Sequence, residues 1–280
     1  MNSNGASGEL TLLGVFAHPD DEQGVGGAFT RAVKDYGAKA YIVSVTSGQA
    51  GQISDPALAT PENLGEVREQ ELRDAVAVYG WEPPILLRYP DGGVADLPPG
   101  QLRDDLVKII RELKPQVLVT FEKTGIYGHV DHIAVHFETF AAFEAAADPK
   151  HRPDLGPAHQ VAKFYYVAMP RSVMKKIAEA MGEEMDFGGD QRTIEIDDIG
   201  TPDEEITTVV DIHDLIDLRS DGMFAHKTQF GEEMKKRIEE RRESNEFFAQ
   251  ESFIRAYPAP TPDASLPDET SILSGIVDEQ

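Results

Sequence analysis

Two short stretches of the chain carry the residue types that perform hydrolytic chemistry. "HPDD" and "GHVDH" each follow an apolar run, "LTLLGVFA" at 10–17 and "QVLVTFE" at 116–122. Imidazoles and carboxylates bind divalent metals and also transfer protons in active sites. The two stretches therefore predict a metal-assisted hydrolytic site. Its candidate residues are His18, Asp20 and Asp21 from the first stretch and His129, Asp131 and His132 from the second.

A catalytic zinc site needs three protein ligands and one open position for water. His18 and Asp21 lie three residues apart on a turn, close enough to share one ion. A histidine after the second run would complete the set, and spacing alone leaves His129, His132 and His136 open. The chain has no cysteine, so thiolate ligands are excluded and Zn²⁺ or Fe²⁺ must be held by His, Asp and Glu.

Two further roles can be assigned from the same residues. A metal lowers the pKa of bound water towards about 7, and a neighbouring carboxylate that is not a ligand can accept its remaining proton. Asp20 is adjacent to Asp21 and is the candidate general base. His129, if a carboxylate such as Asp131 keeps it protonated, can stabilise an oxyanion. The pattern indicates hydrolysis of a carbonyl compound.

These residues need a scaffold that brings two distant loops together. Strand and helix patterns alternate along the chain, which predicts an α/β fold: a Rossmann-like, mostly parallel sheet with helices on both faces. In the doubly wound strand order, the strands at 10–17 and 116–122 are neighbours, and ligands bind above their carboxyl ends. We therefore expect the metal site at that edge of the sheet. The other expected strands are 40–46, 84–90, 163–169 and 207–212, and the expected helices are 24–36, 61–79, 101–114, 131–147, 172–182, 214–230 and 232–248.

Length and charge limit the remaining options. The 280 residues suit one α/β domain over 1–256, followed by a Pro-rich, acidic tail at 257–280 that we expect to lie on the surface. The acidic, turn-rich segment 182–206 is expected to be a surface excursion. A net charge of −24 argues against nucleic acid and anionic membranes as partners. With no apolar run near the ~20 residues that span a bilayer and no signal-peptide pattern at the N-terminus, we expect a cytoplasmic protein.

Other common catalytic motifs are absent. "GVGG" after the first strand is an incomplete dinucleotide fingerprint, and the acid expected after the second strand is replaced by "VTSGQ". The chain contains no G-x-x-x-x-G-K-[ST] and no G-x-S-x-G. NAD binding, P-loop phosphate chemistry and the serine-hydrolase elbow are therefore excluded.

The sequence resembles the PIG-L/LmbE-like N-deacetylases, zinc hydrolases that remove the acetyl group from N-acetylglucosaminyl compounds. The resemblance covers roughly residues 10–140 and is carried by "AHPDDE" (17–22), "REQEL" (68–72) and "GHVDH" (128–132), with a weaker "AHKTQ" (225–229). It implies zinc ligands at His18, Asp21 and His132, with Asp20 as the general base. It also implies an oxyanion role for His129 with Asp131, carbonyl polarisation by Tyr127, and substrate contacts from Arg68, His226 and Gln229.

We therefore expect a zinc-dependent N-deacetylase that releases acetate from a small N-acetylated amino-sugar conjugate. The alternatives are an amidase that cleaves thiol conjugates by the same zinc mechanism, a metal-dependent phosphoesterase, and a sugar-binding module without catalysis. The second half of the chain carries no signature that identifies the group attached to the sugar. The sequence also leaves open whether the protein forms a homo-oligomer.

Overall fold

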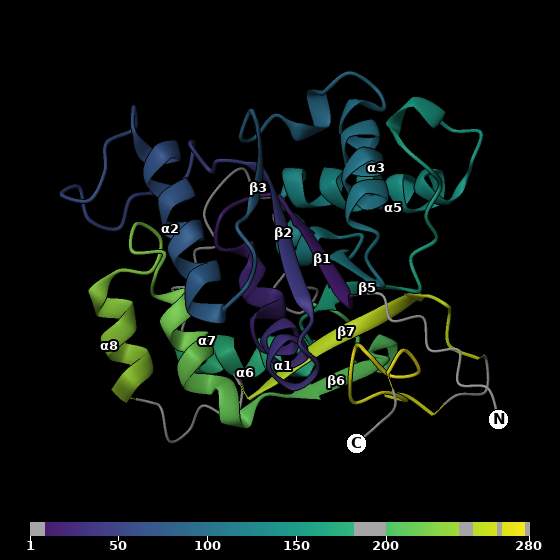
Figure 1. The fold of residues 1–280 in the computed structure, drawn as a ribbon. Helices are drawn as coiled ribbons and strands as arrows, with labels where there is room; N and C mark the ends of the chain where they lie inside the picture. The colour runs from purple at the N-terminus through teal and green to yellow at the C-terminus, as the bar shows by residue number, and fades with distance from the viewer. Residues whose placement is uncertain (1–8, 182–199, 241–248, 262–264, 278–280) are drawn as a thin grey trace.

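A seven-stranded sheet forms the centre of the molecule, in the order β3-β2-β1-β4-β5-β7-β6 (Figure 1). The computed structural model describes residues 9–181, 200–240, 249–261 and 265–277. Neighbouring strands from β3 to β5 are parallel, and β7 runs antiparallel to both β5 and β6. The expected α/β fold with a mostly parallel sheet is confirmed. The strands are β1 (Thr11–Phe16), β2 (Lys39–Thr46), β3 (Ile85–Tyr89), β4 (Val117–Phe121), β5 (Lys163–Ala168), β6 (Thr208–Asp211) and β7 (Gln250–Tyr257).

Helices pack on both sides of the sheet. Helices α1 and α2 lie on one side with α7, and α3 packs beside α5 on the other (Figure 1). Among the described residues, no helix is both long and apolar enough to cross a bilayer. The α-helices are α1 (Gly26–Tyr36), α2 (Leu64–Tyr79), α3 (Gln101–Leu113), α4 (Gly125–Gly128), α5 (Val130–Ala147), α6 (Arg171–Met181), α7 (Ile216–Met223) and α8 (Glu232–Glu240). The short 3₁₀ turns are η1 (Asp21–Val25), η2 (Val94–Asp96), η3 (Pro153–Leu155), η5 (Asp203–Glu205) and η6 (His213–Leu215).

The two strands that precede the candidate site are neighbours and are wholly buried. Every residue of β1 and of β4 is buried, because helices cover both faces of a parallel sheet. Leu12 pairs with Val117 and Gly14 with Val119 in a parallel register. The carboxyl ends of the two strands therefore lie side by side, as the sequence predicts.

Helix α2 begins later than the sequence indicates. We expected Thr60 as the N-cap, whereas the helix begins at Leu64 with Asn63 as the N-cap. Asn63 Oδ1 instead accepts a hydrogen bond from the Thr60 N–H at 2.7 Å, which completes a separate turn before the helix. The expected stop at Gly80 is confirmed, since Gly80 has a left-handed φ of 73°.

Strand β7 was not predicted. The sequence suggested a helix over 232–248, of which the structure describes α8 up to Glu240, while 241–248 lie outside the described residues. In β7 the buried positions are Glu251 and Phe253. A charged residue at an inward position hides the alternation that marks a strand.

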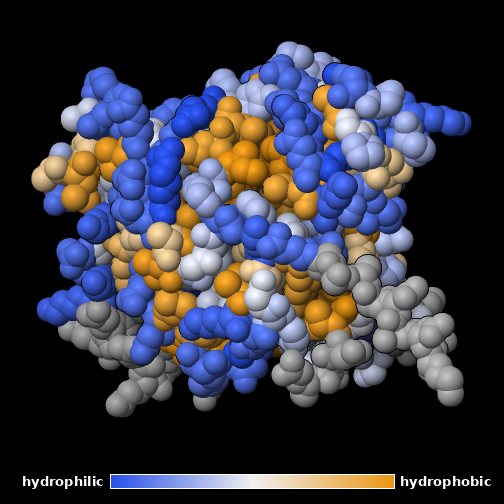
Figure 2. Space-filling view, in the orientation of Figure 1, coloured by the Kyte–Doolittle hydropathy of each residue, from blue (hydrophilic) through white to orange (hydrophobic). Residues whose placement is uncertain are grey.

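The C-terminal segment is also more buried than expected. Ile272 and Leu273 are each only 1 % exposed and belong to the core, and Glu269 contacts Lys163 and Tyr165 of β5. The expectation of a surface tail is therefore wrong for this part of the chain. Of the acidic excursion, 182–199 lie outside the described residues, and 200–206 end in the buried Ile206. Hydrophilic residues cover much of the face seen in Figure 2, with apolar residues visible near its centre.

Candidate active site

Three potential metal ligands meet at the carboxyl ends of β1 and β4. His18 and Asp21 follow β1, and His132 lies in the first turn of α5. His18 Nδ1 lies 3.3 Å from Asp21 Oδ2, His132 Nε2 lies 3.3 Å from Asp21 Oδ1, and the two ring nitrogens are also 3.3 Å apart. Tetrahedral ligands at zinc–nitrogen and zinc–oxygen distances would be separated by about 3.4 Å. The donor set and its spacing fit a zinc-sized ion.

The second nitrogen of His18 faces two carboxylates. His18 Nε2 lies 3.0 Å from Asp91 Oδ1 and 3.4 Å from Asp131 Oδ2, although neither contact has the angles of a hydrogen bond. Burial lowers the pKa of His18, but Asp131, Asp21 and Asp91 outweigh it and raise that pKa well above its usual value. Metal-binding histidines commonly have their other ring nitrogen next to a carboxylate. Asp91 and Asp131 are in that position.

Asp91 was missed by the sequence reasoning. It follows β3 in "RYPDGG", where an Asp before two glycines is typical of a turn. Its backbone does lie in a turn, yet its side chain is only 7 % exposed and points at His18. The available signal was its position, because β3 belongs to the same parallel set as β1 and β4 and ends at the same edge.

Asp20 lies beside the ligands in a strained backbone conformation. Its φ is 107°, in the left-handed region that residues with a side chain rarely adopt. Its Oδ2 lies 3.2 Å from Arg68 Nη2. Burial raises the pKa of Asp20 to about 6, against the opposing effect of Arg68. A carboxylate in this place can accept a proton from a water next to the three ligands.

Arg68 of α2 is buried against Asp20 rather than exposed on the helix surface. Its Nη2 donates to Pro19 O at 2.6 Å and its Nη1 donates to Gly48 O at 2.8 Å, while Nε has no hydrogen-bond partner. A Cβ on Gly48 would lie 2.2 Å from Nη1, so the glycine leaves the space that the guanidinium occupies. Arg68 therefore connects the loop after β2 to the "HPDD" segment.

The residues expected to stabilise the oxyanion lie together, but their contacts differ from the expectation. His129 is the N-cap of α5, and its Nδ1 accepts the backbone N–H of Asp131 at 3.2 Å. The Asp131 carboxylate instead accepts from Gly92 N and Val94 N and faces His18. Burial lowers the pKa of His129 to about 4, so in the structure Asp131 does not keep His129 protonated. A neutral ring that accepts at Nδ1 carries its hydrogen on Nε2 and can still donate from there.

Tyr127 lies next to these histidines on the loop after β4. Its ring is 5.2 Å from that of His132 and 6.1 Å from that of His129, both edge-on. The preceding Ile126 has a φ of 68°, and its N–H donates to Glu122 Oε1. A Cβ at Gly125 would approach His132 Cβ at 2.9 Å, so a glycine is needed where this loop crosses the ligand.

The structure places three other candidate residues outside the metal-facing group. His136 Nδ1 contacts Phe121 O at 2.8 Å and its ring lies against Tyr166. His226 is 0 % exposed and contacts Glu22, and its expected contact with substrate stays a prediction. Gln229 donates to Gln52 O on the neighbouring loop.

Comparisons with known proteins show which proteins the chain is similar to. Residues 13–143 match the family model described as PIG-L, GlcNAc-PI de-N-acetylase. The chain is 36 % identical over 241 residues to a 1D-myo-inositol 2-acetamido-2-deoxy-alpha-D-glucopyranoside deacetylase of Catenulispora acidiphila. That match covers 78 % of this chain and 75 % of the relative.

Two solved structures share the fold. The conserved protein TT1542 from Thermus thermophilus is similar with a TM-score of 0.61 and 26 % identity, over 91 % of this chain and 99 % of that one. The N,N'-diacetylchitobiose deacetylase from Pyrococcus horikoshii is similar with a TM-score of 0.66 and 19 % identity, over 90 % and 88 % of the two chains.

Proposed function

The chain belongs to the PIG-L family of GlcNAc-PI de-N-acetylases, and on this premise we propose that it removes the acetyl group from an N-acetylglucosaminyl conjugate. The observation that carries the proposal is the cluster of His18, Asp21 and His132, in which a donor atom of each side chain lies 3.3 Å from a donor atom of each of the other two. A relative named for deacetylation of an acetamido-glucopyranosyl inositol supports an N-acetylglucosaminyl inositol as the substrate class.

We assign His18, Asp21 and His132 as the metal ligands, with Zn²⁺ as the expected ion and Fe²⁺ as the alternative. A divalent ion in this position supplies Lewis acidity and lowers the pKa of a coordinated water towards about 7. Asp91 and Asp131 orient the His18 ring by facing its Nε2. Phe121 stacks on the His132 ring at 4.0 Å between centroids and limits the rotation of that ring.

The proton transfers are assigned to groups beside the ligands. Asp20 accepts the proton of the attacking water and returns it to the departing amine, since it adjoins Asp21 and, unlike Asp91 and Asp131, does not face the Nε2 of His18. His129 donates from Nε2 to the oxyanion that forms on the acetyl carbonyl, because its Nδ1 already accepts the Asp131 N–H. Tyr127 lies next to both histidines and helps to polarise that carbonyl. Arg68 holds Asp20, with its Nη2 3.2 Å from Asp20 Oδ2, and its expected contact with the substrate stays a prediction.

Acetate release tests this assignment directly. Metal-loaded wild-type protein should release acetate from an N-acetylglucosaminyl inositol, and a chelator should abolish the release. Asp20→Ala should retain its metal and lose about 10²- to 10⁴-fold in kcat, which is the usual contribution of a general base. Asp74→Ala, at an exposed position of α2, is the matched control and should behave as wild type. Full activity in Asp20→Ala would remove Asp20 from the mechanism, and no turnover by metal-replete wild type would reject the function.

A further inference from the structure

The conformation of Asp20 raises the question of what holds it. A non-glycine residue at a φ of 107° is strained and persists only when its surroundings fix it. The Asp20 C=O accepts from Gln23 N at 3.2 Å, and its N–H donates to Glu22 Oε2 at 2.9 Å. Glu22 is therefore the side chain that fixes the amide of Asp20.

Glu22 is itself almost fully buried and must be satisfied by donors. It is 1 % exposed, and its Oε1 accepts from Gln23 Nε2 at 2.8 Å. The same oxygen lies 2.6 Å from His226 Nε2. Since a carboxylate only accepts hydrogen bonds, Nε2 of His226 carries the hydrogen in this contact. The Nδ1 of His226 is buried without a hydrogen-bond partner, so among the described residues the imidazole ring hydrogen-bonds only to Glu22.

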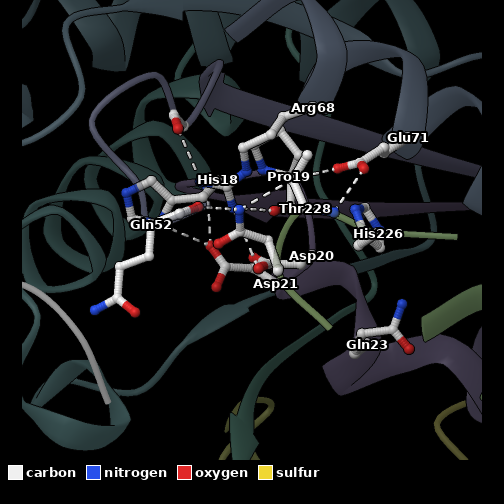
Figure 3. A network of polar contacts seen from close by, with 12 residues as sticks. His18, Pro19, Asp20, Asp21, Gln23, Gln52, Arg68, Glu71, His226 and Thr228 are labelled. Carbon is white, nitrogen blue, oxygen red and sulfur yellow. Dashed lines mark hydrogen bonds and ion pairs between the residues drawn. The ribbon is translucent and has the colours of Figure 1, made fainter. Parts of the chain in front are cut away.

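His226 comes from the second half of the chain, in a segment that is hydrogen-bonded to residues of the first half. It lies in "AHKTQ" after α7, and Thr228 in that segment donates through N and Oγ1 to Glu71 of α2. Ser54 N donates to Thr228 O on the other side. Figure 3 shows His226, Glu71 and Thr228 on one side of the "HPDD" segment, with Arg68 above Asp20. The hydrogen bonds to Glu71 and Ser54 therefore fix this segment independently of the contact between His226 and Glu22.

We propose that Glu22 and His226 form a buried positioning pair, which holds the backbone of Asp20 in its left-handed conformation so that its carboxylate points at the metal-facing side of the site. The inference rests on the proposed role of Asp20 as general base. It gives "AHKTQ" a function that does not require contact with substrate. Arg68 holds the carboxylate of Asp20, and the Glu22–His226 pair holds its amide.

Substitutions of His226 separate positioning from packing. His226→Leu keeps the volume and removes the donor, whereas His226→Gln places an N–H where Nε2 was. His226→Leu should lower kcat by about 10- to 100-fold, the usual effect of a residue that supports an active-site group. KM and metal content should stay near wild type, because neither the ligands nor Arg68 are altered. His226→Gln should restore most of kcat.

Glu22→Gln tests the other partner. Each oxygen of Glu22 accepts at least one hydrogen bond, so an amide would turn a donor towards either Asp20 N or His226 Nε2. It should lose kcat to a similar degree as His226→Leu. The kcat of the double variant Glu22→Gln/His226→Leu should be no lower than that of the less active single variant, because the effects of residues that act as a unit are not additive.

A control and a structural measurement make the result decisive. Glu269→Gln disturbs a buried carboxylate that pairs with Lys163 and should lower stability without changing kcat. Crystal structures should show Asp20 at a positive φ in wild type and His226→Gln and at a negative φ in His226→Leu. An unchanged kcat in His226→Leu, or a kcat loss that His226→Gln does not restore, would overturn the proposal. Because φ is read without turnover, an inactive wild type would reject the function and leave the positioning test intact.

Discussion

His18 serves two purposes through its two ring nitrogens. Nδ1 faces Asp21 and His132, the other two members of the proposed ligand set, whereas Nε2 faces Asp91 and Asp131. Asp131 is 0 % exposed and is held by the backbone N–H groups of Gly92 and Val94. The loop after β3 therefore contributes to the orientation of a ligand that follows β1.

Metal content distinguishes His132 from His136. Removing one of three ligands should abolish tight binding, so His132→Ala should be purified nearly free of metal. His136→Ala should retain about one metal per chain, because its Nδ1 is used by Phe121 O and not by the ligand group. Elemental analysis of proteins purified without chelator provides the measurement. Equal metal loss in both variants would contradict the assignment of His132.

Much of the site could be predicted from residue types and their places after strands. His18, Asp20, Asp21, His129 and His132 do lie together, because two apolar runs became neighbouring strands. Spacing could not choose between His132 and His136, which lie one turn apart on α5, the first against His18 and the second against Phe121 O. That choice depends on the helix orientation, which a single sequence does not specify.

At the scale of elements, the glycines after β1 allow close packing. The sequence predicts that Gly24, Gly26 and Gly27 let the first helix begin close to the strand ends without side chains filling the cleft. A Cβ at Gly27 would lie 2.5 Å from Ile212 Cγ2, next to β6. Gly24 similarly faces Val167 of β5. These glycines let the start of α1 pack closely against the second half of the sheet.

Gly27→Ala should therefore destabilise the fold through overpacking. We expect a loss of about 1–3 kcal/mol in the free energy of unfolding. Ile212→Ala alone should cost about 2–5 kcal/mol, because Ile212 is fully buried. The double variant should lose less than the sum, since the shortened side chain makes room for the new methyl group. Denaturant titrations of the four proteins measure the cycle, and strict additivity would show that the contact is not the cause.

Strand β7 links the second half of the chain to the site. Glu251 accepts the N–H groups of Gly27 and Ala28 at 2.7 and 2.8 Å, at the N-terminus of α1 where a negative charge is favoured. Arg219 Nε lies 3.3 Å from the same carboxylate. The contacts of Glu251 with Gly27 and Ala28 join residues 224 and 223 positions apart, so no local pattern could predict them.

At the scale of the whole molecule, the C-terminal segment completes the core. Glu269 pairs with Lys163 of β5 and Arg255 of β7, and Thr208 Oγ1 of β6 donates to it at 3.0 Å. Three strands are thus connected through one carboxylate. The tail is rich in proline and acidic residues, and this composition predicts a segment that lies on the surface. The prediction is wrong because the buried part consists of only a few apolar residues near the end of the tail.

Leu273→Ala should accordingly affect the stability of the whole domain. Leu273 is 1 % exposed within the core, and truncating a buried leucine costs about 2–5 kcal/mol. Thr270→Ala, at an exposed position in the same segment, should change stability by less than about 0.5 kcal/mol. Unfolding by denaturant, followed together with the metal content of the folded protein, provides the measurement. If Leu273 contributes to the core, Leu273→Ala should unfold in one cooperative transition at a lower denaturant concentration than wild type, with the metal retained in the folded protein. If Leu273→Ala is instead as stable as Thr270→Ala, the C-terminal segment is not part of the folding unit.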